Sequence, residues 1–300
     1  MARAMSAPLL MIGSALLFSI MGVCVKYASA QYSAGEIVLY RSLVGAVFLF
    51  GLARWRGGSL RTEVPAMHFW RSLTGVFSLV LWFYAIGKLP LATAITLNYM
   101  SSVWMALFLI GGAVMLGAAK VDPRLVATVL TGFVGVALVL QPTIDRDQWQ
   151  GAMAGLLSGL GAAMAYLQVT ALGRVGEPEY RVVFYFSIGG IVAGGLLTLA
   201  GGAHAHSWSG AALLVATGVL ATVAQMMMTR AYAIGRALSN ASLQYLGIVF
   251  SFAFGVLLFD DPVTWVALAG MALIICAGLA ATRLRQRAPA AGPESTLGDS

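Results

Sequence analysis

The sequence predicts an all-α membrane protein with ten transmembrane helices, arranged as two inverted five-helix repeats. Three observations predict this fold: the composition, a series of long apolar runs, and short patterns that occur once in each half. Of 300 residues, 60% are hydrophobic and 10% are charged, whereas an ordinary soluble domain has roughly 25% charged residues. A soluble fold of this size still exposes about a quarter of its unfolded surface. The composition therefore excludes a cytosolic enzyme, a disordered chain and a disulfide scaffold.

A helix needs about 20 apolar residues to cross a bilayer, and ten runs of about that length follow one another. Proline supports their edges, because it is tolerated in the first turn of a helix and costs about 3 kcal/mol inside one. Pro8, Pro90, Pro123 and Pro262 mark the starts of runs and Pro142 follows one. With no proline inside a run, the sequence disfavours interrupted helices. The expected spans are 8–28, 34–53, 67–87, 91–116, 123–141, 151–172, 182–201, 210–231, 237–258 and 263–282.

The basic residues predict the orientation. If the N-terminus is cytoplasmic, fourteen of the eighteen Lys and Arg residues fall in cytoplasmic segments. Lys26, Lys88 and Arg146 fall outside, and Arg41 alone lies within a span. This positive-inside bias places both termini in the cytoplasm, with a bacterial inner membrane as the expected location and residues 288–300 as a disordered tail. The fourteen are Arg3, Arg54, Arg56, Arg61, Arg71, Lys120, Arg124, Arg174, Arg181, Arg230, Arg236, Arg283, Arg285 and Arg287.

Three short patterns recur in the same order in residues 1–146 and 147–287. They are FYAIGK at 83–88 with AYAIGR at 231–236, LNYM at 97–100 with LQYL at 243–246, and VDP at 121–123 with DDP at 260–262. Because five is odd, a second five-helix repeat enters the membrane from the opposite side. Inverted repeats allow one site to face either side in turn, so the sequence predicts a transporter. A non-transporting receptor or scaffold is the alternative from another class.

With these features the sequence resembles the drug/metabolite transporter superfamily, in its ten-helix EamA branch, over about residues 8–285. Within that branch it is most similar to bacterial aromatic amino-acid exporters. The resemblance implies export of aromatic and other bulky neutral amino acids, along a path surrounded by the first, third, fourth, sixth, eighth and ninth spans. The chain departs from the family pattern because residues 98–105 lack a proline and Asp260-Asp261 stands where glutamate is usual. An exporter of another small metabolite or drug-like compound is therefore a second possibility.

The fourth span carries Asn98, Ser101 and Trp104 at a spacing that forms a slowly turning row on a helix. The repeat gives Gln244 and Phe250 equivalent positions on the ninth span. Amides and aromatic rings offer an aromatic amino acid hydrogen bonds and stacking, although interhelical hydrogen bonds and packing explain the same residues. The other candidates for substrate binding are Tyr99, Tyr245, Trp82, Tyr84, Tyr166, Gln168 and Gln225.

Arg41 is expected to pair at a gate or helix interface near Lys26 and Glu36, because an unpaired charge inside the bilayer is costly. The spans carry no deep Asp or Glu to relay protons, so facilitative transport is expected. They also carry no nucleophile–base set and no metal-ligand spacing. We therefore expect no enzymatic activity, no cofactor and no nucleic-acid partner. The expected partners are a small-molecule substrate and the lipid bilayer. The oligomeric state stays open, with a monomer sufficient for the path.

Overall fold

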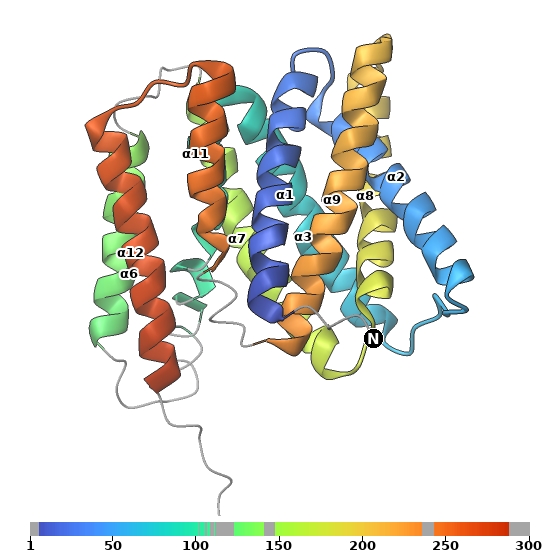
Figure 1. Cartoon of the computed structure of the whole chain (residues 1–300), viewed down its shortest axis with the longest axis horizontal. Coiled ribbons are helices and arrows are strands. Elements are labelled where there is room, and N and C mark those ends of the chain that lie inside the picture. The colour runs from blue at the N-terminus through green and yellow to red at the C-terminus, as the bar shows by residue number, and fades with distance from the viewer. Residues whose placement is uncertain are drawn as a thin grey trace, which may run out of the picture.

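The protein is helical in the computed structural model, and its helices run side by side (Figure 1). No strand occurs in the part that the structure describes, which is residues 6–101, 103–105, 107–108, 111, 123–140, 148–235 and 243–287. The helices are α1 (Ala7–Ala28), α2 (Ala34–Trp55), α3 (Pro65–Lys88), α4 (Leu91–Tyr99), α6 (Pro123–Leu140), α7 (Trp149–Arg174), α8 (Glu179–Gly201), α9 (Trp208–Ile234), α11 (Leu246–Phe259) and α12 (Trp265–Arg287). The expected tail at 288–300 lies outside the described residues.

Each of the ten expected spans overlaps one of these helices. Six of the described helices, namely α1, α2, α3, α7, α8 and α9, are long and apolar enough to cross a membrane by themselves. The count of ten spans and the orientation of the termini therefore stay predictions. Local signals set the edges: Ser33 and Glu36 form a capping box at the start of α2, and proline occupies the first turn of α1 and α3.

The outer surface of the bundle is apolar, as a bilayer requires. Val47 and Leu199 are 72% and 84% exposed, although water would penalise such side chains. At helix ends, Trp55, Trp208 and Trp265 are more than four-fifths exposed, which is typical of aromatic anchors at the headgroup level. The chain is a multi-pass membrane protein.

The helices of the two halves pack against each other in pairs. The most extensive contacts join α3 to α7, α1 to α9, α2 to α8 and α6 to α12, and α4 packs against α11. In Figure 1, α12 lies beside α6 and α1 beside α9. Glycine permits the closest approach: a Cβ at Gly194 on α8 would lie 2.6 Å from the backbone nitrogen of Leu39 on α2. A Cβ at Gly159 on α7 would lie 2.7 Å from the carbonyl oxygen of Leu97 on α4.

The fourth and ninth expected spans are interrupted, contrary to the expectation drawn from the absence of internal proline. In the fourth, α4 ends at Tyr99, and the Met100 N–H donates to both Thr96 and Leu97 carbonyls at 3.2 Å before helix resumes at Ser101. In the ninth, Tyr245 forms a turn directly before α11. Both turns lie within the matched LNYM and LQYL patterns. At Met100 the backbone stays in the right-handed helical region, and the Trp104 N–H donates to the Met100 carbonyl at 3.0 Å, so the turn is a local distortion.

Candidate functional site

A central cavity lies where the two halves meet. Helices α1, α2, α3, α4, α7, α8 and α9 line it, together with Gln244 just before α11. These include all six spans expected around a path, and α2 and α8 in addition. Its empty volume is about 540 Å³, and the lining side chains lie close to one another. The polar lining residues are Arg41, Arg71, Ser78, Asn98, Gln225 and Gln244, and the aromatic ones are Phe18, Trp82, Tyr99, Tyr166 and Phe186.

Helix α3 contributes a stripe to this cavity. Arg71, Gly75, Ser78 and Trp82 lie four, three and four residues apart, which places them on one face of a helix. Arg71 is 3% exposed, so its side chain is buried inside the protein and lines the cavity. The missing side chain of Gly75 leaves the space that the Arg71 guanidinium fills, since a Cβ there would overlap Arg71 Nη1.

Two arginines face this cavity without an acidic partner. Arg41 from α2 is 4% exposed, and Arg71 from α3 is equally buried. Arg41 Nε and Arg71 Nε and Nη1 have no hydrogen-bond partner among the described residues. Among the described residues no ion pair joins Arg41 to Glu36, which pairs with His204 instead, so a gate or interface role for Lys26, Glu36 and Arg41 stays a prediction.

The aromatic ring of Phe186 lies near both guanidinium groups. Arg71 Cζ lies 4.4 Å from the centroid of the Phe186 ring on α8, and Arg41 Cζ lies 5.0 Å from the same centroid. An aromatic face attracts a cation by its quadrupole, with about 2 kcal/mol when desolvated. Both cations therefore lie close to the same ring, although their like charges repel each other.

Amides and tyrosines form another part of the cavity lining. Asn98 Nδ2 donates to Ser158 Oγ at 3.0 Å, which fixes its orientation on α4. Gln244 Oε1 accepts from Tyr232 Oη at 3.3 Å, and the Tyr232 ring stacks on that of Tyr166 with centroids 5.6 Å apart. Both amides expected from the repeat thus reach the cavity, and each already has a protein partner.

The predicted binding residues divide into two groups. Trp82, Tyr99, Asn98, Tyr166, Gln225 and Gln244 line the cavity, whereas Ser101, Trp104, Tyr245, Phe250, Tyr84 and Gln168 are not among its lining residues. Ser101 and Trp104 therefore do not continue into the cavity the row that begins at Asn98. Trp104 packs instead against the cluster of Met105 and Ala163.

Two of the excluded residues bond at helix interfaces. Tyr84 Oη donates to Gln150 Oε1 at 3.1 Å on the exposed side of the bundle. Gln168 Oε1 accepts from Thr74 Oγ1 at 2.8 Å between α7 and α3. Both side chains therefore support packing between helices.

Separate polar contacts close the end of the bundle where α1 ends and α2 begins. Lys26 Nζ donates to the Leu89 carbonyl at 2.7 Å and lies 3.7 Å from Asp261 Oδ1. Glu36 is fully buried, accepts from the His204 N–H at 2.8 Å and contacts His204 Nδ1 at 2.6 Å. Lys26 and Glu36 each join the first half to the second, but through different partners.

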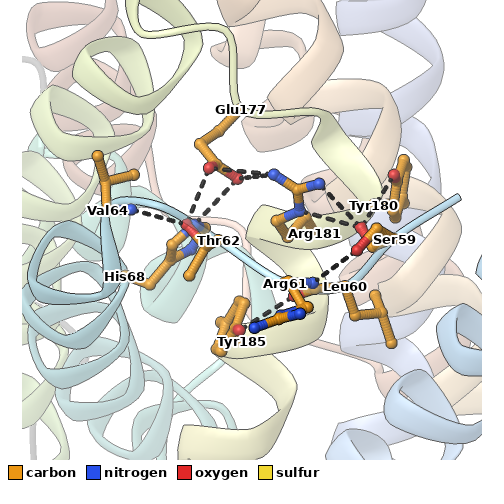
Figure 2. Close-up of polar contacts among 10 residues, drawn as sticks. All are labelled: Ser59, Leu60, Arg61, Thr62, Val64, His68, Glu177, Tyr180, Arg181 and Tyr185. Atoms are coloured by element: carbon orange, nitrogen blue, oxygen red, sulfur yellow. Dashed lines mark hydrogen bonds and ion pairs between the residues drawn. The ribbon is translucent and has the colours of Figure 1, made fainter.

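The other end is closed by a cluster around Glu177, in the loop between α7 and α8 (Figure 2). Glu177 accepts from Thr62 Oγ1 at 2.8 Å and from Arg181 Nη1 at 3.0 Å, and it lies 3.2 Å from His68 Nε2. Arg181 also donates to the Ser59 carbonyl at 2.9 Å through Nη2. Burial raises the pKa of Glu177, but the hydrogen bonds from Thr62, Arg181 and His68 outweigh it, so the net shift is downward.

This arrangement, a helical membrane bundle with a polar and aromatic cavity between its halves and polar contacts at both ends, is typical of a membrane transporter. The EamA-like transporter family matches residues 5–141. The pseudopaline exporter CntI of Pseudomonas aeruginosa is 32% identical over 94% of this chain and 97% of its own length. The chain belongs to the EamA-like transporter family.

Other relatives agree with that assignment. A riboflavin transporter of Rhizobium johnstonii is 28% identical over 96% of this chain and 95% of its own length. One solved crystal structure shares the fold with a TM-score of 0.66 at 19% identity, covering 94% of this chain and 98% of its own. Members of the family transport small molecules and are not enzymes.

Sequence reasoning missed two residues at the centre of the cavity. Arg71 was counted only among the basic residues of the cytoplasmic side and was not considered for binding, although it lies in the second turn of its helix. Its spacing to Gly75, Ser78 and Trp82 was the signal that places it on a polar stripe. Phe186 had no such signal, because its apolar helix offers several aromatic residues and only packing selects the one that faces inward.

Proposed function

We propose that this protein exports a small organic metabolite from the cytoplasm through the central cavity, by alternating exposure of that cavity to the two sides of a bacterial inner membrane. The observation that carries the proposal is the cavity itself. It has polar and aromatic walls, both halves contribute to it, and polar contacts link helices and loops at each end of the bundle. A rigid scaffold has no need for buried unpaired charges at its centre, since their desolvation is expensive.

The packing of the helices supports two inverted repeats, residues 1–146 and 147–287. In that arrangement α1, α2, α3, α4 and α6 correspond to α7, α8, α9, α11 and α12. Exchanging the halves converts the α1–α9 pair into the α7–α3 pair, and both are among the most extensive contacts. The same exchange leaves α2–α8, α4–α11 and α6–α12 as they are. A pseudo-twofold axis in the membrane plane accounts for all five pairs.

The direction and the substrate class draw on the relatives. An exporter of pseudopaline matches nearly the whole chain at 32% identity, which supports export of a small metabolite. The basic residues support cytoplasmic termini. Transport is proposed to be facilitative, because the described residues that line the cavity include no Asp or Glu to carry a proton.

A neutral aromatic amino acid is the second candidate. The rings of Trp82, Tyr99 and Tyr166 favour it, and an arginine would bind its carboxylate. Its ammonium group would then lie in a cavity whose described lining holds two cations and no anion. We therefore place another small metabolite first.

Uptake by purified protein tests the proposal. Proteoliposomes are incubated with a bacterial small-molecule extract, and their contents are identified by mass spectrometry. We expect at least one metabolite to equilibrate faster than in protein-free vesicles, and the Tyr166→Ala variant to lose most of this uptake. Trp208→Ala, which alters a residue 95% exposed at a helix start, is the matched control and is expected to transport normally. Wild-type vesicles that take up nothing would favour a receptor or scaffold instead.

A further inference from the structure

The unpaired N–H donors of the cavity belong to two neighbouring helices, α2 and α3. They are Arg41 Nε on α2, Arg71 Nε and Nη1 on α3, and Trp82 Nε1 further along the same face of α3. All are N–H groups, so each needs an acceptor. Asn98 is bonded to Ser158 through its Nδ2 donor, and Gln244 Oε1 accepts from Tyr232. The described residues that line the cavity include no Asp or Glu, so this lining is short of negative charge.

Two positive charges, those of Arg41 and Arg71, lack a negative partner in the described lining. Arginine stays protonated in proteins, and moving a cation out of water costs several kcal/mol unless a counter-charge compensates. The contacts of Arg41 and Arg71 with Phe186 compensate only part of this cost. A monoanion would neutralise one guanidinium and leave the other. Two carboxylates would neutralise both, and each fits the planar fork of an arginine.

The remaining walls define the rest of the ligand. Phe18 and Trp82, which both line the cavity, pack edge to face with centroids 6.3 Å apart, and the lining Tyr166 stacks on Tyr232 behind it. The lining also includes Met21, Met228 and Leu79. These surfaces favour a flat apolar or aromatic body.

From this geometry we propose that Arg41 and Arg71 form a two-anion subsite, and that the transported molecule is a dicarboxylate with an aromatic or unsaturated body. The inference rests on the proposed function only in calling this ligand the transported molecule. The subsite itself is a statement about binding.

Three compounds with one benzene ring and different charge test it: terephthalate (−2), its monoamide (−1) and its diamide (0). Binding to the detergent-purified protein is measured by thermal unfolding at fixed chloride concentration. We expect the apparent Kd to rise at least tenfold from the dianion to the monoanion and again to the diamide. Replacing the dianion by extra chloride at equal ionic strength is expected to give no comparable stabilisation.

Variants assign the effect to the two arginines. Arg41→Gln and Arg71→Gln are each expected to abolish the preference for the dianion over the monoanion, and they are expected to fold because each removes an unpaired buried charge. Arg71→Lys keeps the charge without the fork, and a partial loss of a few fold is expected. Arg54→Gln is the matched control: Arg54 also stacks on a phenylalanine, with its Cζ 5.2 Å from the Phe50 ring, but outside the cavity.

The outcomes separate the two proposals. Equal affinity for the three compounds, equal stabilisation by chloride, or an unchanged preference in both Arg→Gln variants would overturn the two-anion subsite, even if the protein transports other molecules. Charge-ordered binding that both variants lose, in a protein that takes up nothing into liposomes, would support the subsite and refute the transport function.

Discussion

Arg71 reaches the cavity only because the residue one turn further along α3 has no side chain. A methyl group at Gly75 would occupy the position of Arg71 Nη1 and lie 3.0 Å from Phe186 Cε2. The flexible end of the arginine would move rather than the helix, so folding survives while the geometry of the charge changes. Single residues thus set the positions of the charges in this site.

Gly75→Ala is expected to reduce transport at least tenfold with little loss of thermal stability, because it displaces the Arg71 guanidinium from Phe186. Gly51→Ala is the control, since a Cβ at Gly51 meets nothing within 4 Å. Initial uptake rates and unfolding temperatures of both variants provide the check. Unchanged uptake by Gly75→Ala would mean that the position of Arg71 has no importance for transport.

Glu177 makes stability depend on pH. Its pKa is lowered in the folded protein, and that of an unfolded glutamate is about 4.3. The stabilisation is therefore complete above the unfolded value and disappears as the pH falls through the lower folded value. Glu177→Gln is expected to cost about 1–2 kcal/mol at pH 7 and to reduce the acid sensitivity. Thermal unfolding of both proteins between pH 3 and 7 measures this, and parallel pH profiles would contradict it.

At the scale of elements, α2 and α8 are in backbone contact. The Cβ of a residue at position 194 would lie 2.8 Å from Leu39 Cα and 2.9 Å from the Gly35 carbonyl oxygen. Backbone atoms cannot rotate away as a side chain can, so the helices would have to separate. Since Arg41 and Phe186 lie on these two helices, their separation would also disturb the cavity.

Gly194→Ala is expected to destabilise the protein by about 1–3 kcal/mol through overpacking. Gly195→Ala, one residue further, is expected to be neutral or stabilising by less than about 1 kcal/mol, because its nearest contact is Leu39 Cδ1 at 4.0 Å. Unfolding temperatures in detergent compare the pair. Equal temperatures would show that the two helices can separate at no cost.

The helices themselves were largely predictable, whereas the site was predictable only in part. Long apolar runs and proline edges locate helices because the bilayer fixes their length and proline is excluded from their interiors. The turn after Tyr99 was not predictable from proline. Of the row Asn98, Ser101 and Trp104, only Asn98 lines the cavity, because spacing along one helix does not say which neighbouring helices cover its face.

At the scale of the whole molecule, the expected orientation of the bundle in the membrane decides which end must open first during export. If the basic residues determine it, the Glu177 cluster faces the cytoplasm and the Lys26 and Glu36 contacts face the periplasm. Export then requires the Glu177 cluster to open first, so that the cavity can receive its substrate from inside the cell. The contacts at Lys26 and Glu36 open afterwards.

In a background with Cys24 and Cys276 replaced by Ser, Ser209→Cys is expected to react with a membrane-impermeant maleimide in intact bacterial cells. Gly58→Cys is expected to react only after the cells are permeabilised. Both positions lie in or next to loops at opposite ends of the bundle. The reverse pattern would invert the orientation, and labelling of both in intact cells would contradict a multi-span topology in which these ends lie on opposite sides.

Phe186 bears on how strongly the proposed subsite would bind an anion. The guanidinium groups of Arg41 and Arg71 lie 5.0 and 4.4 Å from the centroid of its ring, and an aromatic quadrupole attracts a cation less strongly than a full negative charge does. Under the two-anion proposal, each guanidinium exchanges a weak aromatic partner for a carboxylate. The binding free energy is then set by the difference between these two interactions.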